Sequence, residues 1–81
     1  MSTLRVAYTD VAFDALKKMS CDRRARFGQE ISHLAGTPYI HGRPVDDLLD
    51  KRRAVLAGTV TDYWVSVTVL TVTVVSIVHT D

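Results

Sequence analysis

The sequence predicts an α+β fold, in which an N-terminal helical hairpin packs on one face of an antiparallel sheet in the order β-α-α-β-β-β. Almost every residue from Val60 to His79 is β-branched or aromatic, and these residue types favour strands. Residues 10–36 instead carry apolar side chains at helical spacing, and such a stripe must be buried against the sheet. The length of 81 residues is that of one domain, spanning residues 1–81.

The first strand is predicted at Leu4–Tyr8, where apolar and polar residues alternate. Thr9 and Asp10 follow, and either side chain can cap a helix that runs from Val11 to about Met19. Ala12, Leu16 and Met19 form the apolar stripe of this helix.

A second helix is predicted after Ser20-Cys21-Asp22, a segment that interrupts the first pattern and supplies a new N-cap. Its apolar stripe consists of Phe27, Ile31 and Leu34. Gly36 and Pro38 then end the helix. Because the link between the two helices is short, we expect them to pack as an antiparallel pair.

The segment Thr37–Asp50 is predicted to be a loop, because Pro38, Gly42 and Pro44 divide it. It also carries three carboxylates, but their spacing does not match the acidic calcium-binding loop, so we expect no metal site. A short strand is predicted at Ala54–Ala57, ended by Gly58.

The C-terminal stretch must fold back on itself. As a single strand it would span about 65 Å at about 3.3 Å per residue, whereas a chain of this size has a radius of gyration of about 12 Å. Along this stretch the alternating apolar residues switch between odd and even positions twice. The first change predicts a hairpin turn near Val69–Thr71, and the second, from Val74 to Val75, predicts a bulge or a strand end buried on both faces. Regularly spaced polar residues argue against a membrane helix.

The charged residues are unevenly distributed along the chain. All ten lysines and arginines lie at or before Arg53, although the net charge is only +1. A phosphate-binding surface must therefore be built from the first two thirds of the sequence. Cys21 is the only cysteine, so no internal disulfide can form, and no apolar segment follows Met1. Both features predict a cytoplasmic protein.

The order of these elements resembles that of the RelE/ParE superfamily, the small bacterial toxins of type II toxin–antitoxin pairs. The similarity covers nearly the whole chain and rests on spacing. The residues that carry it are Leu34, Pro38, Gly42, Pro44, Leu48 or Leu49, Arg53, Gly58, Tyr63 and Ile77-Val78-His79. The resemblance implies a cytoplasmic toxin with a cognate antitoxin as its partner.

Members similar to RelE cut messenger RNA on the ribosome without a metal or other cofactor, by driving the ribose 2′-hydroxyl onto the neighbouring phosphate. This chemistry needs a base, an acid and cations beside the phosphate. The resemblance implies that Arg53 and His79 are catalytic. The RNA-binding residues would be Lys51, Arg52, Arg43 and Trp64.

Two departures from the family pattern leave other functions open. The family commonly has a Tyr-Arg pair where this chain has Tyr63-Trp64, and no Tyr or Arg follows His79. One alternative is a ParE-like toxin that binds DNA gyrase and needs no nuclease activity. Another is a non-toxic interaction module, such as a homodimer, that keeps the fold without catalysis. In every case, an open edge of the Val/Thr hairpin would require a covering partner or self-association.

The nuclease hypothesis depends on one spatial prediction. The C-terminal tail should form paired strands that place Arg53 beside His79 on the face of the sheet that the helices leave bare. Only then can one phosphate contact both side chains.

Overall fold

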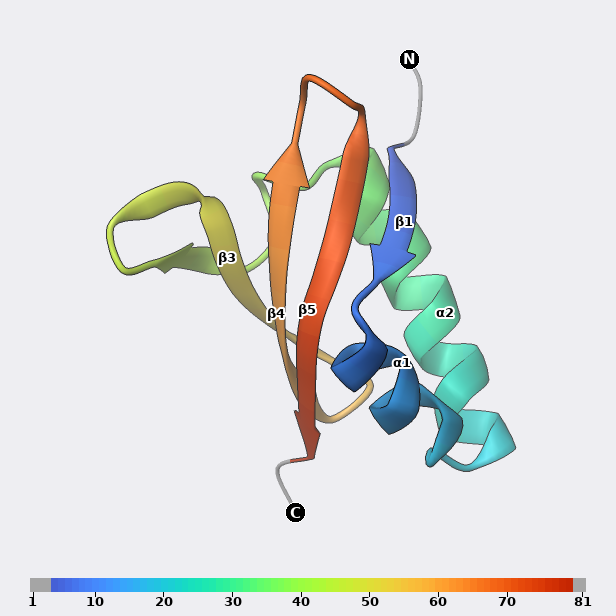
Figure 1. Cartoon of the computed structure of the whole chain (residues 1–81). Helices are drawn as coiled ribbons and strands as arrows, with labels where there is room; N and C mark the ends of the chain where they lie inside the picture. Colours follow the sequence, from blue (N-terminus) through green and yellow to red (C-terminus); the bar gives the residue numbers. More distant parts are fainter. Residues whose placement is uncertain (1–3, 80–81) are drawn as a thin grey trace.

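The computed structural model describes residues 4–79, which form two helices and a five-stranded sheet (Figure 1). The elements in chain order are β1 (Arg5–Tyr8), α1 (Asp10–Lys17), α2 (Cys21–Gly36), β2 (Arg43–Val45), β3 (Leu48–Leu56), β4 (Thr59–Ser66) and β5 (Thr71–His79). The predicted α+β class, with the helices ahead of the main run of strands, is confirmed.

The sheet is mixed, with the strand order β1-β5-β4-β3-β2, so the predicted all-antiparallel sheet is wrong at one pairing. β1 runs parallel to β5, from Arg5 opposite Thr71 to Tyr8 opposite Val74. The chain can return to the same sheet in parallel because two helices separate β1 from the other strands. As a result β5, the strand richest in valine, has a neighbour on each side and offers no open edge.

Both helices begin at side-chain caps. The Thr9 Oγ1 atom accepts a hydrogen bond from the Ala12 N–H at 3.2 Å, and the Thr9 hydroxyl donates one to the Val75 carbonyl at 2.7 Å. Ser20 Oγ accepts from the Arg23 N–H at 3.2 Å. The N-cap predicted within Ser20-Cys21-Asp22 is present at Ser20, and Thr9 rather than Asp10 caps α1. Within residues 4–79, neither helix combines the length and apolar character needed to cross a membrane.

The core lies between the helices and one face of the sheet. The predicted stripe of α2 is buried, with Phe27, Ile31 and Leu34 each at most 2 % exposed. Opposite it lie alternate residues of the central strands, namely Tyr63 and Val65 on β4 and Val72, Val74 and Ile77 on β5. Among residues 4–79, no helix covers the other face of the sheet (Figure 1).

The segment predicted as a loop at Thr37–Asp50 contains a hairpin instead. β2 pairs antiparallel with β3, and β3 begins at Leu48, ahead of the predicted start at Ala54. Asp46 and Asp47 form the turn with φ angles of 56° and 59°. A two-residue hairpin turn needs such left-handed residues, and aspartate tolerates them better than most side chains.

The C-terminal hairpin is confirmed. Its turn occupies residues 67–70, overlapping the predicted position, and Leu70 adopts a φ of 49°. The predicted bulge is also present, because Tyr63 lies opposite Val74 whereas Asp62 lies opposite Ser76. Val75 is the extra residue, and it shifts by one the side-chain alternation of all that follows on β5.

Candidate functional site

The bare side of the sheet, here called the open face, is defined by side-chain alternation along the central strands. On β3, Arg52 is buried while Lys51 and Arg53 are not, and on β4 Tyr63 is buried while its neighbours are more exposed. The open face comprises Arg43 on β2, Lys51, Arg53 and Val55 on β3, Val60, Asp62, Trp64 and Ser66 on β4, and Thr71, Thr73, Ser76 and Val78 on β5.

The strand register brings a cation and an aromatic ring together on this face. Lys51 lies directly opposite Trp64, and the Lys51 ammonium is 6.0 Å from the centre of the Trp64 ring. Lys51 also donates a hydrogen bond to Asp46 Oδ2 at 3.2 Å. Trp64 remains 38 % exposed, so its ring can stack with a planar ligand such as a nucleobase.

Arg53 and Asp62 form the next row of the open face. The Arg53 Nε donates to Asp62 Oδ1 at 2.7 Å, and Nη2 donates to Oδ2 at 3.2 Å. This two-point contact is the geometry that guanidinium groups also use for phosphate. The hydrogen bonds from Arg53 to Asp62 raise the pKa of Arg53, so the side chain stays cationic and serves as a fixed charge rather than a proton donor.

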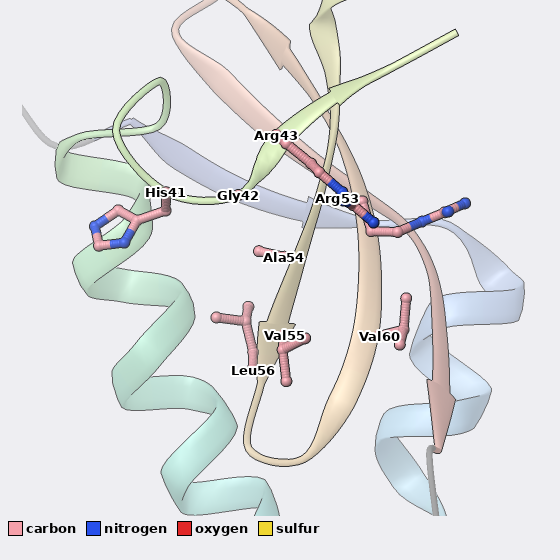
Figure 2. Close-up of a pocket in the computed structure, with 8 residues that line it drawn as sticks. All are labelled: His41, Gly42, Arg43, Arg53, Ala54, Val55, Leu56 and Val60. Atoms are coloured by element: carbon pink, nitrogen blue, oxygen red, sulfur yellow. The ribbon is translucent and has the colours of Figure 1, made fainter.

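Arg43 reaches the same row because of the glycine before it. Gly42 has a φ of +68°, and a Cβ atom at this position would lie 2.4 Å from the Arg53 carbonyl oxygen. Only glycine allows the chain to approach β3 so closely here. Arg43 is consequently paired with Arg53 across β2 and β3, as Figure 2 shows.

Arg52 does not belong to the open face, unlike the other residues predicted to bind RNA. It is 4 % exposed, and its guanidinium donates hydrogen bonds to the carbonyl oxygens of Tyr39, His41, Gly42 and Leu49 at 3.2 to 3.4 Å. The Tyr63 hydroxyl donates to the carbonyls of Pro38 and His41 at 3.2 and 2.9 Å. Together these two side chains hold the segment between α2 and β2.

His79 does not lie beside Arg53, and the predicted juxtaposition is wrong. His79 is paired with Thr59, which is fully buried on the helix face, and its Nδ1 atom lies 3.1 Å from the Arg23 guanidinium of α2. The Val75 bulge is the physical reason, since it moves His79 from the open face to the helix face. The two rows are also separated along β4, from Thr59 to Asp62, by about 10 Å at about 3.3 Å per residue.

The open face therefore provides fixed cations and an exposed aromatic ring. None of the strand residues from 4 to 79 that make up this face is a histidine or a tyrosine. His41 contacts Thr37 Oγ1 at 3.0 Å and packs its ring edge against His33. The open-face groups that can exchange a proton are Lys51 and Asp62. No cluster of three metal-ligating side chains occurs in this part of the chain.

Sequence reasoning located most of this surface but missed how two residues shape it. Arg43, Lys51, Arg53 and Trp64 do come together on one face. Asp62, the partner of Arg53, was not singled out, and Gly42 was named only for the loop and for the family resemblance, not for positioning Arg43. The strict alternation along Lys51-Arg52-Arg53 was the available signal that Arg52 points the other way.

Comparison of the sequence with protein-family models and with curated proteins found no match. Comparison of the structure with solved structures did find matches. The RelE–RelB toxin–antitoxin complex of E. coli contains a chain that matches with a TM-score of 0.81 and 16 % identity, covering 96 % of this chain and 98 % of that one.

Two further complexes give similar results. The RelBE2 toxin–antitoxin complex of Mycobacterium tuberculosis matches with a TM-score of 0.81 and 21 % identity, over 98 % of this chain and 100 % of that one. The archaeal RelE–RelB complex of Pyrococcus horikoshii matches with a TM-score of 0.75 and 21 % identity, over 96 % of each chain. These similarities extend over almost the whole chain, and the protein therefore has the same fold as these RelE chains.

Proposed function

We propose that this protein is the toxin of a type II toxin–antitoxin pair and blocks translation by cleaving messenger RNA on the ribosome. Support comes from the RelE fold together with one observation, the grouping of Arg43, Lys51, Arg53 and Trp64 on the open face. Three guanidinium or ammonium groups and an exposed indole are the components of a single-stranded RNA surface. The matched RelE structures include complexes with RelB antitoxins, so we also propose a cognate antitoxin and action in the bacterial cytoplasm.

The proposed chemistry uses only residues of the open face. The ribose 2′-hydroxyl attacks the adjacent phosphorus, its proton leaves, and the 5′-oxygen of the next nucleotide departs and takes up a proton. Arg53 stabilises the negative charge that develops on the phosphate oxygens. Lys51 and Asp62 are the groups within one row of Arg53 that can transfer these protons. Trp64 stacks on a base and fixes the strand.

The test is induction of the protein in a bacterial host, followed by growth measurement and mapping of messenger RNA ends. Growth should stop, and new 5′ ends should appear in translated messages. Arg53→Ala should restore growth and remove those ends. Arg26→Ala, which removes an exposed arginine of α2, is the matched control and should remain toxic. Full toxicity of Arg53→Ala, or growth arrest without new messenger RNA ends, would contradict the nuclease proposal.

A second candidate is a toxin or interaction module of the same fold that acts by binding alone. It is favoured by the position of His79, which leaves the open face without an imidazole. A ParE-like protein would inhibit DNA gyrase, so a supercoiling assay with purified protein separates the two candidates. A harmless protein that forms a stable homodimer would instead support the non-toxic module.

A further inference from the structure

A pocket opens where β2 stops covering β3. β2 pairs with β3 only as far as Arg43 opposite Arg53. Among residues 4–79, no strand therefore pairs with the outer edge of β3 from Ala54 to Leu56, the edge that faces away from β4. The pocket at this edge has a volume of about 400 Å³, which is within the range of small-molecule sites. Figure 2 shows Arg53, Val55 and Val60 on one side of β3, away from α2.

One wall of the pocket is strongly cationic. Arg43 and Arg53 lie directly opposite each other, an arrangement of like charges that destabilises a sheet. Asp62 binds Arg53 through both carboxylate oxygens, while Arg43 forms no ion pair with any residue from 4 to 79. The pair therefore retains a net positive charge, which a phosphate group would offset by bridging the two guanidinium groups.

The adjoining wall is apolar. Val55 lies directly opposite Val60 on the open face, and Val55 is 69 % exposed. Both residues line the pocket together with Ala54. This apolar row is two residues along β3 from Arg53, and the row of Lys51 and Trp64 is two residues along in the opposite direction. The open face thus presents an aromatic ring, a cationic pair and an apolar pocket in that order.

We propose that this pocket binds the nucleoside attached to the phosphate held by Arg43 and Arg53. A second base then stacks on Trp64, so the open face recognises a dinucleotide as base, phosphate and base. This inference rests on the proposed function, in which RNA is the natural ligand. It adds a site for the second nucleotide, in which Val55 and Val60 contact the base.

Isothermal titration of the full chain tests the pocket with three probes, namely AMP, ribose 5-phosphate and inorganic phosphate. AMP should bind more tightly than ribose 5-phosphate, because only AMP brings a base to the valine wall. Val55→Ser should weaken AMP about fivefold, as expected for the loss of apolar contact, and leave ribose 5-phosphate unchanged. Arg43→Ala should weaken all three. Val69→Ser, which changes an exposed valine in the turn between β4 and β5 that does not line the pocket, should bind like the parent.

Equal binding of AMP and ribose 5-phosphate would overturn the base pocket and leave only a phosphate site. The base pocket would also be overturned if Val69→Ser weakened AMP binding as much as Val55→Ser does. The dinucleotide ApA can also be titrated into the full chain while the fluorescence of Trp64, the only tryptophan, is recorded. ApA should quench this fluorescence, whereas AMP bound in the pocket should not. AMP binding without toxicity would retain the pocket and reject the nuclease function, whereas messenger RNA cleavage without AMP binding would do the reverse.

Discussion

The two faces of the sheet use the same residue type in opposite ways, as Arg52 and Arg53 show. The Arg52 guanidinium points to the helix side and binds four backbone carbonyls, with 4 % of the residue exposed. The Arg53 guanidinium points to the open face, where 44 % of the side chain is exposed, and binds one carboxylate. The two adjacent arginines therefore differ in what their removal would leave behind. Water could bind the carboxylate that Arg53 contacts, whereas no group would replace the Arg52 guanidinium at the carbonyl oxygens.

This difference separates stability from function. On the helix side, polar groups are committed to the segment between α2 and β2, and their loss leaves buried acceptors without donors. On the open face, water can replace the partner of each polar side chain. These side chains can therefore exchange their present partner for a ligand at little cost. Mutations on the two faces should accordingly affect different measurements.

The largest expected effect on stability is that of Arg52→Ala. Because the carbonyl oxygens of Tyr39, His41, Gly42 and Leu49 lose a charged donor, the free energy of unfolding should fall by about 3 kcal/mol. Urea denaturation measures this change. Arg52→Lys should recover only part of it, since an ammonium group cannot reproduce the planar fork. A loss as small as that of Arg53→Ala would show that the two faces do not differ in this way.

Next in size is the effect of Arg53 on RNA binding. Arg53→Ala should leave the unfolding transition nearly unchanged and weaken binding of a short single-stranded RNA by about tenfold or more, because a charge-assisted phosphate contact is lost. Fluorescence anisotropy at fixed salt measures the affinity.

Asp62→Asn sharpens the same comparison. It removes the carboxylate that competes with phosphate for Arg53, so RNA affinity should rise even though a native ion pair is lost. Weaker RNA binding by Asp62→Asn would mean that Asp62 positions Arg53 for the ligand instead of competing with it.

A smaller effect is expected from the buried Tyr63. Burial raises the pKa of Tyr63 above its ordinary value of 10.0, while the nearby Arg52 acts in the opposite direction. The folded state then holds the phenolic proton more tightly than the unfolded state, so this contribution to stability is complete below about pH 10 and is lost as the pH rises through the folded pKa.

Tyr63→Phe should thus lower stability at neutral pH by about 1 to 2 kcal/mol, because Pro38 and His41 lose a donor, and should reduce the loss of stability above pH 10. Tyr8 is the control, since burial also raises its pKa but its hydroxyl makes no hydrogen bond within residues 4–79. Tyr8→Phe should reduce the alkaline loss with little change at neutral pH. Identical neutral-pH behaviour of the two variants would contradict the role given to the Tyr63 hydroxyl.

Local patterns in the sequence were sufficient for the helices and the C-terminal hairpin. The caps, the stripe of Phe27, Ile31 and Leu34 and the phase changes near Leu70 and Val75 all depend on neighbouring residues. The parallel pairing of β1 with β5 was not predictable in this way, because it depends on where the helices return the chain. The β2–β3 hairpin was missed because its Asp46-Asp47 turn lacks glycine and asparagine.

The candidate site was predictable where alternation is regular and not where it is interrupted. Lys51, Arg53 and Trp64 share a face because β3 and β4 alternate without a break between these residues. His79 lies beyond the Val75 bulge. One inserted residue reverses the face of every later side chain on that strand, so a bulge that the sequence indicated also decided which face His79 would occupy.

The smallest expected effect is that of His79→Ala. Since His79 lies on the helix face against Arg23, its removal should leave RNA affinity and messenger RNA cleavage unchanged and alter stability by less than about 1 kcal/mol, as is usual for an exposed polar contact. Anisotropy and end mapping alongside Arg53→Ala provide the comparison. A loss of cleavage in His79→Ala equal to that in Arg53→Ala would require both residues to contact one phosphate, which the register of β4 and β5 does not allow. It would then follow that the C-terminal strand rearranges when RNA binds, with the Val75 bulge released so that His79 turns to the open face.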